Sequence, residues 1–186
     1  SPVQIPGTQW NSVNTGHFYA LATKTNGTLW VWGNNQFGYL GQNNKADYSS
    51  PIQIPGTQWS NFSSSSYLSN IVKKTDGTLW SWGYNSSGRL GLGDQGIHRS
   101  SPTQIPGTQW NFSSIGSASG YAIKTDGTLW AWGLNGNGAL GQNDLVPRSS
   151  PVQIGGTQWE TVNSGFQYTL AKKTDGTLWA WGRNNT

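Results

Sequence analysis

Apolar residues alternate in character along several short stretches of the chain. Side chains point to opposite faces of a β-strand in turn, so the stretch Thr28–Trp32 places Trp30 and Trp32 on one face and Leu29 and Val31 on the other. Neither face is polar, so both faces of the predicted strand are expected to be buried. The same pairing of a tryptophan face with a leucine-plus-small-residue face recurs at Leu79–Trp82, Leu129–Trp132 and Leu178–Trp181.

This stretch belongs to a longer unit that is repeated four times. The segment SPVQIPGTQW at residue 1 returns as SPIQIPGTQW at 50, SPTQIPGTQW at 101 and SPVQIGGTQW at 150. The period is near 50 residues, which is typical of solenoids and propellers. We therefore divide a single domain, residues 1–186, into repeats 1–49, 50–100, 101–149 and 150–186.

Each repeat is long enough for four short strands. In the first repeat these are predicted at Gln9–Asn14, Tyr19–Lys24 and Thr28–Trp32, followed by Pro51–Ile54. Proline cannot donate to a strand ladder, so the strand that begins with proline is expected at the outer edge of the sheet. Asn-Gly or Asp-Gly between the second and third strands predicts a tight hairpin. The turn residues are Asn26, Asp76, Asp126 and Asp175.

A sheet with two apolar faces can be buried by stacking on copies of itself, as the blades of a propeller do. We therefore predict an all-β fold: a β-propeller of four-stranded blades, with four repeats in this chain. Stacked indoles on a surface could instead bind sugars or bases, but recurrence in every repeat favours a role in the core. The predicted core tryptophans are Trp10, Trp30, Trp32, Trp59, Trp80, Trp82, Trp110, Trp130, Trp132, Trp159, Trp179 and Trp181.

Composition narrows the class of protein further. Charged residues make up 10% of the chain, and 26 glycines and 12 tryptophans favour turns and packed sheets over helices. Cysteine is absent, which excludes disulfides and thiolate zinc sites but leaves the localisation open. The net charge of +4 is scattered, so no nucleic-acid partner is expected. Without a leader or a long apolar run we expect a soluble chain with no membrane partner, and without methionine we expect a processed product or an excerpt.

Three motifs together resemble a known family. D-G-T-L-W-A-W-G, then N-x-x-G-x-L-G, then P-x-x-I is similar to the regulator of chromosome condensation repeat, and the match covers nearly the whole chain. The tight, polar form of the repeats most resembles bacterial and phage-encoded arrays. The resemblance implies a seven-bladed propeller. It also implies guanine-nucleotide exchange on a small GTPase through a wedge inserted in a blade, but the nearly equal repeats leave no room for a wedge.

The two ends of the chain are complementary. Pro2–Ile5 is a spare fourth strand, whereas the last repeat has three strands and lacks a fourth. Three arrangements follow: the chain closes four blades on itself, or it forms half of an eight-bladed dimer, or it is an excerpt of a larger propeller. In the first two, the strand at 2–5 completes the last blade of the same chain or of another chain.

Candidate catalytic groups are few and dispersed. The chain has His17, His98 and Glu160 besides six aspartates, so we predict a non-enzyme with no catalytic residue, no metal and no cofactor. Asp94 and Asp144 follow the Leu-Gly step, where a loop turn is favoured over a calcium ligand. Lys24, Lys74, Lys124 and Lys173 recur before the hairpins, either as solvated strand ends or as attractors of an anionic partner.

The loops between the third and fourth strands differ most among repeats, and variable loops on a rigid scaffold suit recognition. Aromatic residues and arginine are frequent anchors in interfaces, but unconstrained drift would also produce this variation. We predict a binding scaffold for a protein partner, such as a virion or surface component, with a glycan-binding lectin as the alternative. A bulge in the second strand of the second repeat is expected at Ser63–Ser66. The predicted contact residues are Phe37, Tyr39, Tyr48, Tyr84, Arg89, His98, Arg99 and Arg148.

Overall fold

The computed structural model describes residues 1–64 and 68–183 of the chain. Within these residues the chain forms β-strands that make up four sheets, which we call blades 1 to 4. The strands are β1 (Trp10–Thr15), β2 (Tyr19–Lys24), β3 (Leu29–Gly33) and β4 (Tyr48–Ile54) in blade 1; β5 (Trp59–Ser64), β6 (Ser69–Lys74), β7 (Leu79–Gly83) and β8 (Arg99–Gln104) in blade 2; β9 (Trp110–Ile115), β10 (Ser119–Lys124), β11 (Leu129–Gly133) and β12 (Arg148–Ile154) in blade 3; and β13 (Trp159–Ser164), β14 (Tyr168–Lys173) and β15 (Leu178–Gly182) in blade 4.

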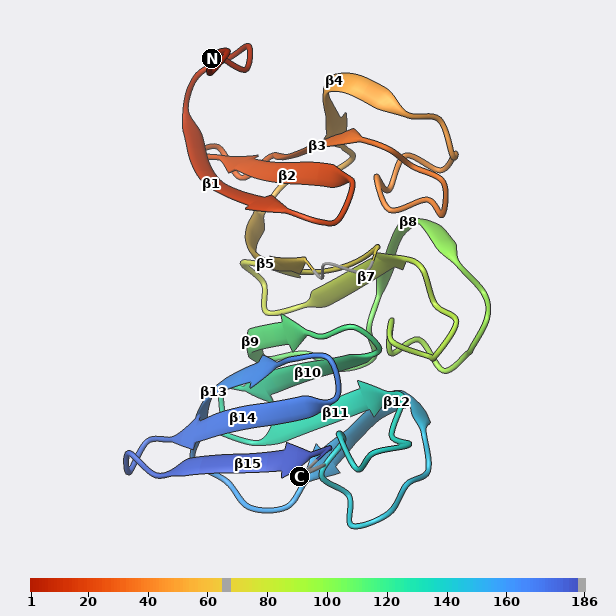
Figure 1. Ribbon diagram of the computed structural model, residues 1–186. Coiled ribbons are helices and arrows are strands. Elements are labelled where there is room, and N and C mark those ends of the chain that lie inside the picture. Colours follow the sequence, from red (N-terminus) through yellow and green to blue (C-terminus); the bar gives the residue numbers. More distant parts are fainter. Residues whose placement is uncertain (65–67, 184–186) are drawn as a thin grey trace.

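The strands of each blade are antiparallel and follow one another in chain order. The first strands of successive blades contact one another, β1 with β5, β5 with β9 and β9 with β13. The strand that carries the Pro-x-Gln segment is therefore at the far edge of its sheet, which confirms its predicted place at the rim, although β4 begins at Tyr48, before the proline. The blades are stacked along an open arc, with the two ends of the chain at opposite ends of the stack (Figure 1). The predicted all-β architecture of propeller blades is confirmed.

The hairpin between the second and third strands has the geometry that its sequence demands. Gly27 adopts a φ of +76°, in the left-handed region that glycine tolerates, and its N–H donates to the carbonyl of Lys24 at 3.0 Å. Asn26 Oδ1 accepts from the Thr28 hydroxyl at 2.7 Å, and the aspartates at this position in the other blades do the same. These residues are turn formers, as predicted.

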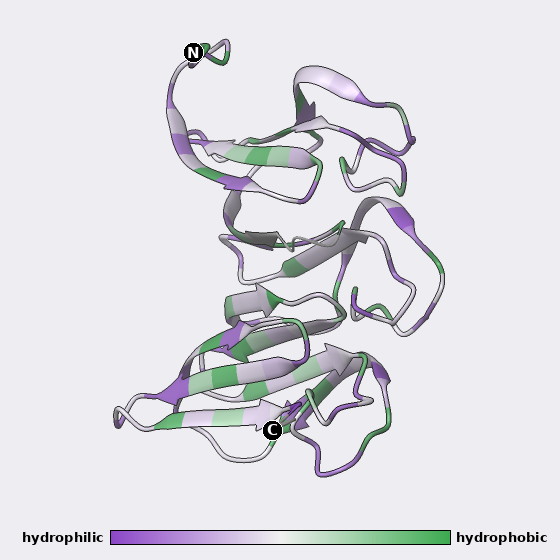
Figure 2. Cartoon of the chain, in the orientation of Figure 1, coloured by the Kyte–Doolittle hydropathy of each residue, from purple (hydrophilic) through white to green (hydrophobic). Residues whose placement is uncertain are grey.

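Each blade packs its leucine face against the tryptophan face of the next blade. Leu29 and Val31 of blade 1 are buried in one cluster with Trp59 and Trp82 of blade 2. Bands of hydrophobic residues cross the middle strands, as in β2 and β14, and hydrophilic residues are prominent in the connections (Figure 2). The stacking is thus driven by burial of apolar surface on both faces of the inner sheets.

The arc is not closed by the chain itself. Residues 1–9 form no strand, and the fourth sheet keeps three strands, so the arrangement in which four blades close on themselves is not what the structure shows. The segment 2–5 does not pair with β15 because the two lie at opposite ends of the arc (Figure 1). Completion of blade 4 by another chain stays a prediction.

Two further observations concern the strands. Ser63 and Ser64 belong to β5, the first strand of its blade, and the rest of the serine-rich stretch, where a bulge was expected, lies outside the described residues. A search of the described residues for a helix with the length and apolar character of a membrane span found none.

Candidate functional site

A buried asparagine organises each loop between the third and fourth strands. Asn35 Oδ1 accepts from the backbone N–H of Leu40 at 2.8 Å, and Asn35 Nδ2 donates to the carbonyl of Asn44 at 3.0 Å. Asn85 and Asn135 make the corresponding bonds to Leu90 and Leu140 in the next two blades. The asparagine of the N-x-x-G-x-L-G motif therefore stabilises the folded loop, because its side chain forms hydrogen bonds with backbone groups that the loop would otherwise bury unpaired.

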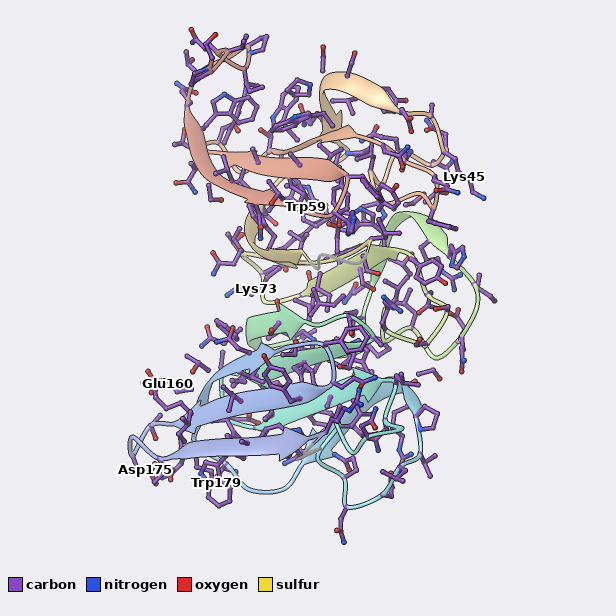
Figure 3. All side chains as sticks on the ribbon, in the orientation of Figure 1. Lys45, Trp59, Lys73, Glu160, Asp175 and Trp179 are labelled. Atoms are coloured by element: carbon purple, nitrogen blue, oxygen red, sulfur yellow. The ribbon has the colours of Figure 1, made fainter. Side chains whose placement is uncertain are left out.

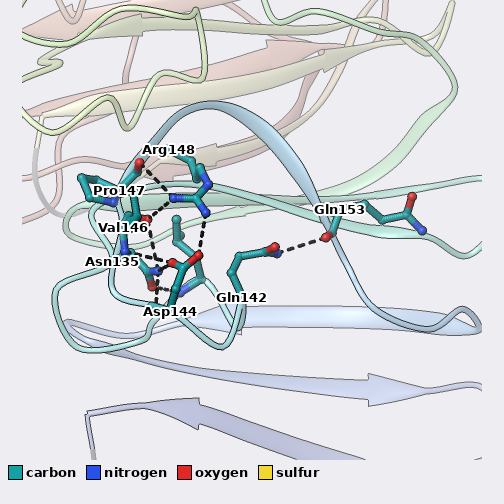
Figure 4. A network of polar contacts seen from close by, with 8 residues as sticks. Asn135, Gln142, Asp144, Val146, Pro147, Arg148 and Gln153 are labelled. Atoms are coloured by element: carbon teal, nitrogen blue, oxygen red, sulfur yellow. Dashed lines mark hydrogen bonds and ion pairs between the residues drawn. The ribbon is translucent and has the colours of Figure 1, made fainter.

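The aspartates that follow the Leu-Gly step complete these loops. Asp144 pairs with Arg148 at 2.6 Å and accepts from the Asn135 side chain at 3.0 Å (Figure 4), and Asp94 pairs in the same way with Arg99. The hydrogen bond from the backbone N–H of Val146 lowers the pKa of Asp144 below its ordinary value, and the Arg148 side chain adds a smaller effect in the same direction. The carboxylates are thus engaged in loop turns, and no group of three or more potential metal ligands occurs within residues 1–64 and 68–183.

Two of the predicted contact residues are buried between blades. Tyr39 stacks on Tyr19 with ring centroids 4.8 Å apart, and its hydroxyl donates to Asn34. Arg89 reaches into blade 3 and donates to the carbonyl of Ser117. Their burial corrects the sequence-based expectation: both residues hold neighbouring blades together and are not presented to a partner. Arg99 and Arg148 are partly exposed but neutralised by the aspartates of their own loops.

Three of the predicted contact residues form one aromatic cluster. The ring of Phe37, from blade 1, lies 5.0 Å from that of Tyr84 and 5.3 Å from that of His98, both from blade 2. Tyr84 and His98 are 4.7 Å apart, and the guanidinium of Arg89 lies 5.0 Å from the Tyr84 ring. All three rings are partly exposed. The seam between blades 1 and 2 therefore presents an aromatic patch.

His98 also accepts a hydrogen bond from the backbone of its own loop. Its Nδ1 accepts from the backbone N–H of Asn85 at 3.0 Å, the position that Asp47 Oδ1 takes opposite Asn35 in blade 1. Burial, and then the nearby charges of Lys45 and Arg89, lower the pKa of His98 from its ordinary value. The neutral imidazole, which can accept this bond, is thus the form that the folded state favours.

The same side of the molecule carries exposed apolar side chains that sequence reasoning missed. The hairpin between β1 and β2 abuts the following loop, since the N–H of Asn34 donates to the carbonyl of Phe18 at 3.0 Å. We use the name loop side for the side of the molecule formed by the hairpins between the first and second strands of the blades and by the loops before β4, β8 and β12. Lys45 lies there, away from Asp175 and Trp179 on the opposite side (Figure 3). The exposed apolar residues of its hairpins and loops are Phe18, Ile97, Leu134, Leu145, Val146 and Phe166.

A signal for these residues was present in the sequence. Leu145 and Val146 are apolar residues within an otherwise polar, turn-rich loop, and Ile97 has the same setting in blade 2. Residues of this kind have no core to join and therefore indicate an exposed contact. The sequence-based choice favoured aromatic residues and arginines and passed over them.

The recurring lysines lie over tryptophan rings. The ammonium group of Lys74 is 4.5 Å from the ring centroids of both Trp59 and Trp80, and Lys24, Lys124 and Lys173 have matching contacts. Each lysine thus makes cation–π contacts with two indoles of its own blade, a role that differs from the two expected for it. Among the twelve tryptophans, five are buried and Trp179 is half exposed; the buried ones are Trp59, Trp82, Trp110, Trp132 and Trp159.

Among the residues that the structure describes, the remaining histidines and the glutamate lie apart from one another. Glu160 forms an ion pair with Lys172 at 3.0 Å, and His98 accepts from backbone. His17 lies 4.1 Å from the ring of Phe18 on the loop side.

The family can now be stated from comparison with known proteins. The model of the regulator of chromosome condensation (RCC1) repeat matches residues 26–69, 76–122 and 126–171, and a second model of that repeat matches residues 159–186. The chain belongs to this repeat family. Comparison with curated protein sequences found no match.

Solved structures of repeat-family propellers share the fold. The chain is 20% identical to human WBSCR16, with a TM-score of 0.84, and the match covers 99% of this chain and 50% of that one. It is 19% identical to yeast RCC1 (Prp20) in a crystal structure with Kap60, with a TM-score of 0.82 and coverage of 98% and 46%. Prp20p from Saccharomyces cerevisiae is matched with 19% identity, a TM-score of 0.82 and coverage of 98% and 48%. The chain therefore spans about half the length of these propellers.

Proposed function

We propose that this chain is a non-catalytic binding module for a protein partner and that the loop side is its contact surface. The observation that carries the proposal is the aromatic patch of Phe37, Tyr84 and His98, set among exposed apolar side chains of neighbouring loops. Partly buried aromatic rings that pack on one another lose little freedom on binding, so they are good anchors for a protein surface.

The similar structures support a protein as the class of partner. One of them is described as bound to Kap60, and another is described by its binding properties to Gsp1p and histones. Both structures are of yeast Prp20, so one propeller of this fold is described as a binder of proteins. The resemblance of these repeats to bacterial and phage-encoded arrays leads us to propose a virion or cell-surface assembly as the setting.

The chemistry of the loop side favours an apolar partner surface. Arg99 and Arg148 are paired with aspartates of their own loops, and Lys45 is an exposed cation beside the aromatic patch. Contact with the patch would be driven by burial of apolar area, with one acidic group of the partner facing Lys45. A glycan is less well supported, because in blade 2 the indoles of Trp59 and Trp80 pack on each other and are covered by Lys74.

The test compares binding by matched variants. The chain is immobilised and exposed to an extract of its source organism, and captured proteins are quantified for the wild type and for Phe37→Ala/Tyr84→Ala. A control, Thr75→Ala/Thr125→Ala, alters exposed residues on the opposite side. The proposal requires a protein that the wild type and the control retain and that the double variant loses at least tenfold, a loss of about 1.4 kcal/mol.

Two other outcomes would replace the proposal. Equal retention by the double variant would move the contact away from the loop side. Selective binding on a glycan array that is lost in Trp179→Ala, the variant of the half-exposed indole, would instead favour a lectin.

A further inference from the structure

The indole of Trp59 is packed at the seam between blades 1 and 2 (Figure 3). Trp59 is 3% exposed, and its Nε1 has no hydrogen-bond partner within the described part of the chain. The other two indoles of blade 2 are paired. Trp80 donates to the Thr78 hydroxyl at 2.9 Å, and Trp82 donates to the carbonyl of Tyr39 at 2.9 Å. A buried donor without an acceptor costs free energy, so the Trp59 N–H indicates an acceptor from outside the chain.

The ammonium group of Lys74 lies beside this donor. Both groups face the backbone of Gly56, because a Cβ atom built on this glycine would lie 3.8 Å from Lys74 Nζ and 3.9 Å from Trp59 Nε1. Lys74 has cation–π contacts with Trp59 and Trp80, and it forms no ion pair with any residue that the structure describes. Two donors that converge in this way, one of them charged, favour an anion with acceptor oxygens.

Trp59 and Lys74 line an open cleft of about 320 Å³ between the two blades. Its walls include the ring of Trp80 and two prolines, Pro55 and Pro102. The volume is near the lower end of the range for small-molecule sites, and the ring and the prolines supply the apolar walls that such sites have. One ammonium group balances one negative charge, so a carboxylate on a small apolar body fits this cleft better than a phosphate does.

The pair of donors recurs at the next two seams. Nε1 of Trp110 and Nε1 of Trp159 are also buried, with no hydrogen-bond partner among the described residues. Lys124 and Lys173 lie over those two rings. The cleft wall differs, because Gln-Asn at residues 42–43 is replaced by Leu-Gly in the following seam. The donors are therefore common to three seams, whereas the wall around them varies.

We propose that the cleft of Trp59 and Lys74 binds a small organic carboxylate. One carboxylate oxygen accepts from Trp59 Nε1, the charge pairs with Lys74 Nζ, and the apolar body lies on the ring of Trp80. Lys74 is partly exposed and its stem is flexible, so the ammonium group turns with the carboxylate and opens the way to the indole N–H. The site lies between blades 1 and 2, apart from the aromatic patch, and does not rest on the proposed function.

Nuclear magnetic resonance of the ¹⁵N-labelled chain tests this directly, because each indole N–H gives its own signal. The Trp59 signal is assigned by its absence in Trp59→Phe. Titration with phenylacetate at neutral pH and fixed ionic strength is expected to move the Trp59 signal downfield along a saturating curve, because its N–H gains an acceptor. The signal of Trp82, whose N–H already has an acceptor, is expected to stay in place.

The choice of probe separates a carboxylate from other ligands. Phenylacetamide, the neutral analogue, and chloride at the same concentration are expected to leave the Trp59 signal in place. A peptide that ends in a free phenylalanine carboxylate is compared with its C-terminal amide. Tighter binding of that peptide than of phenylacetate would assign the carboxylate to the end of a protein chain, and weaker binding would assign it to a free acid. Either result supports the proposal.

The control variant comes from the neighbouring lysine. Lys74→Gln is expected to weaken phenylacetate binding about tenfold or more, through loss of the charged partner. Lys73→Gln removes the same charge from a side chain that donates instead to the carbonyl of Asn111, and it is expected to bind as the wild type does. Both variants keep the Trp59 signal, which also shows that they fold.

Three results would overturn the proposal. They are a Trp59 signal that does not move with phenylacetate, an equal response to phenylacetamide or chloride, and equal affinities for Lys74→Gln and Lys73→Gln. Phe37→Ala/Tyr84→Ala is expected to leave the titration unchanged, so a failure of this test is distinct from a failure of the proposed function.

Discussion

The indole N–H of Trp82 donates to the backbone carbonyl of Tyr39 at 2.9 Å, across the seam between blades 2 and 1. Trp132 and Trp181 make the same bond to Arg89 and Ala139 across the next two seams. Blades 2, 3 and 4 are thus each joined to the preceding blade by an indole hydrogen bond as well as by apolar packing. The bond fixes the relative position of the blades, because an indole N–H without this acceptor would be buried and unpaired.

Replacement of Trp82 by Phe is expected to destabilise the chain by about 2–3 kcal/mol, through the lost hydrogen bond and the smaller ring. Trp80→Phe is the matched control, because Trp80 is half-buried and donates to Thr78 of its own hairpin. Its cost is expected to be about half as large. Urea unfolding followed by circular dichroism measures both, and equal losses would contradict the role of the seam.

Asn85→Ala is expected to cost about 2–3 kcal/mol, because it leaves the N–H of Leu90 buried without an acceptor and cuts the link to Asp94. Asn137→Ala, in an exposed position of the next loop, is expected to change the free energy of unfolding by less than about 0.5 kcal/mol. Chemical denaturation of both variants checks the difference. A similar cost for the two would mean that the motif asparagine does not organise the loop.

The lysine over the paired indoles can be tested in blade 2. Lys74→Gln removes the ammonium from Trp59 and Trp80 and is expected to lower stability by about 0.5–1 kcal/mol, whereas Lys74→Arg keeps the cation and most of that energy. Lys45→Gln, an exposed lysine with no ring contact of this kind, is the control. Thermal unfolding at fixed ionic strength compares the three, and equal midpoints for the glutamine and arginine variants at position 74 would exclude a stabilising cation.

Stability is expected to fall between pH 7 and pH 5 because of His98. The pKa of His98 is lowered in the folded state by burial, Lys45 and Arg89, and Phe37 and Tyr84 cover its ring. The unfolded state therefore takes up the proton first as the pH falls below the ordinary pKa of 6.5. The stabilisation is complete above that value and is lost as the pH approaches the lowered pKa.

The control for this pH dependence comes from blade 1, where Asp47 occupies the acceptor position. His98→Asp keeps an acceptor for the N–H of Asn85 and does not titrate between pH 5 and pH 7. Its stability is expected to be nearly constant over that range in denaturation curves measured at several pH values. An unchanged slope in this variant would assign the effect to another group.

Sequence reasoning succeeded wherever a contact is local and repeated. The alternation of Leu29 and Trp30, the glycine at position 27 and the proline at position 51 each determine backbone or facing within a few residues, so strands, turns and sheet order could be predicted. The recurrence of the repeat then implied blades that stack. No long-range information was needed for these inferences.

The contact residues could be predicted only in part. Phe37, Tyr84 and His98 were identified from their residue type and their place in the variable loops, but their meeting at one seam depends on how blade 1 stacks on blade 2. The same stacking buries Tyr39 and Arg89, which resemble surface anchors in the sequence. Phe18 and Phe166 come from hairpins whose exposure depends on the curvature of the whole arc.

The amino-acid sequence by itself therefore determined the repeat, the strands and the two apolar faces of each blade, because these follow from side-chain alternation and turn chemistry within one unit. Only the tertiary structure decided which side chains remain at the surface and how the blades follow one another along an arc. The physical reason is that burial at a seam is set by two blades together. The angle between blades is decided by their packing, which no single repeat contains.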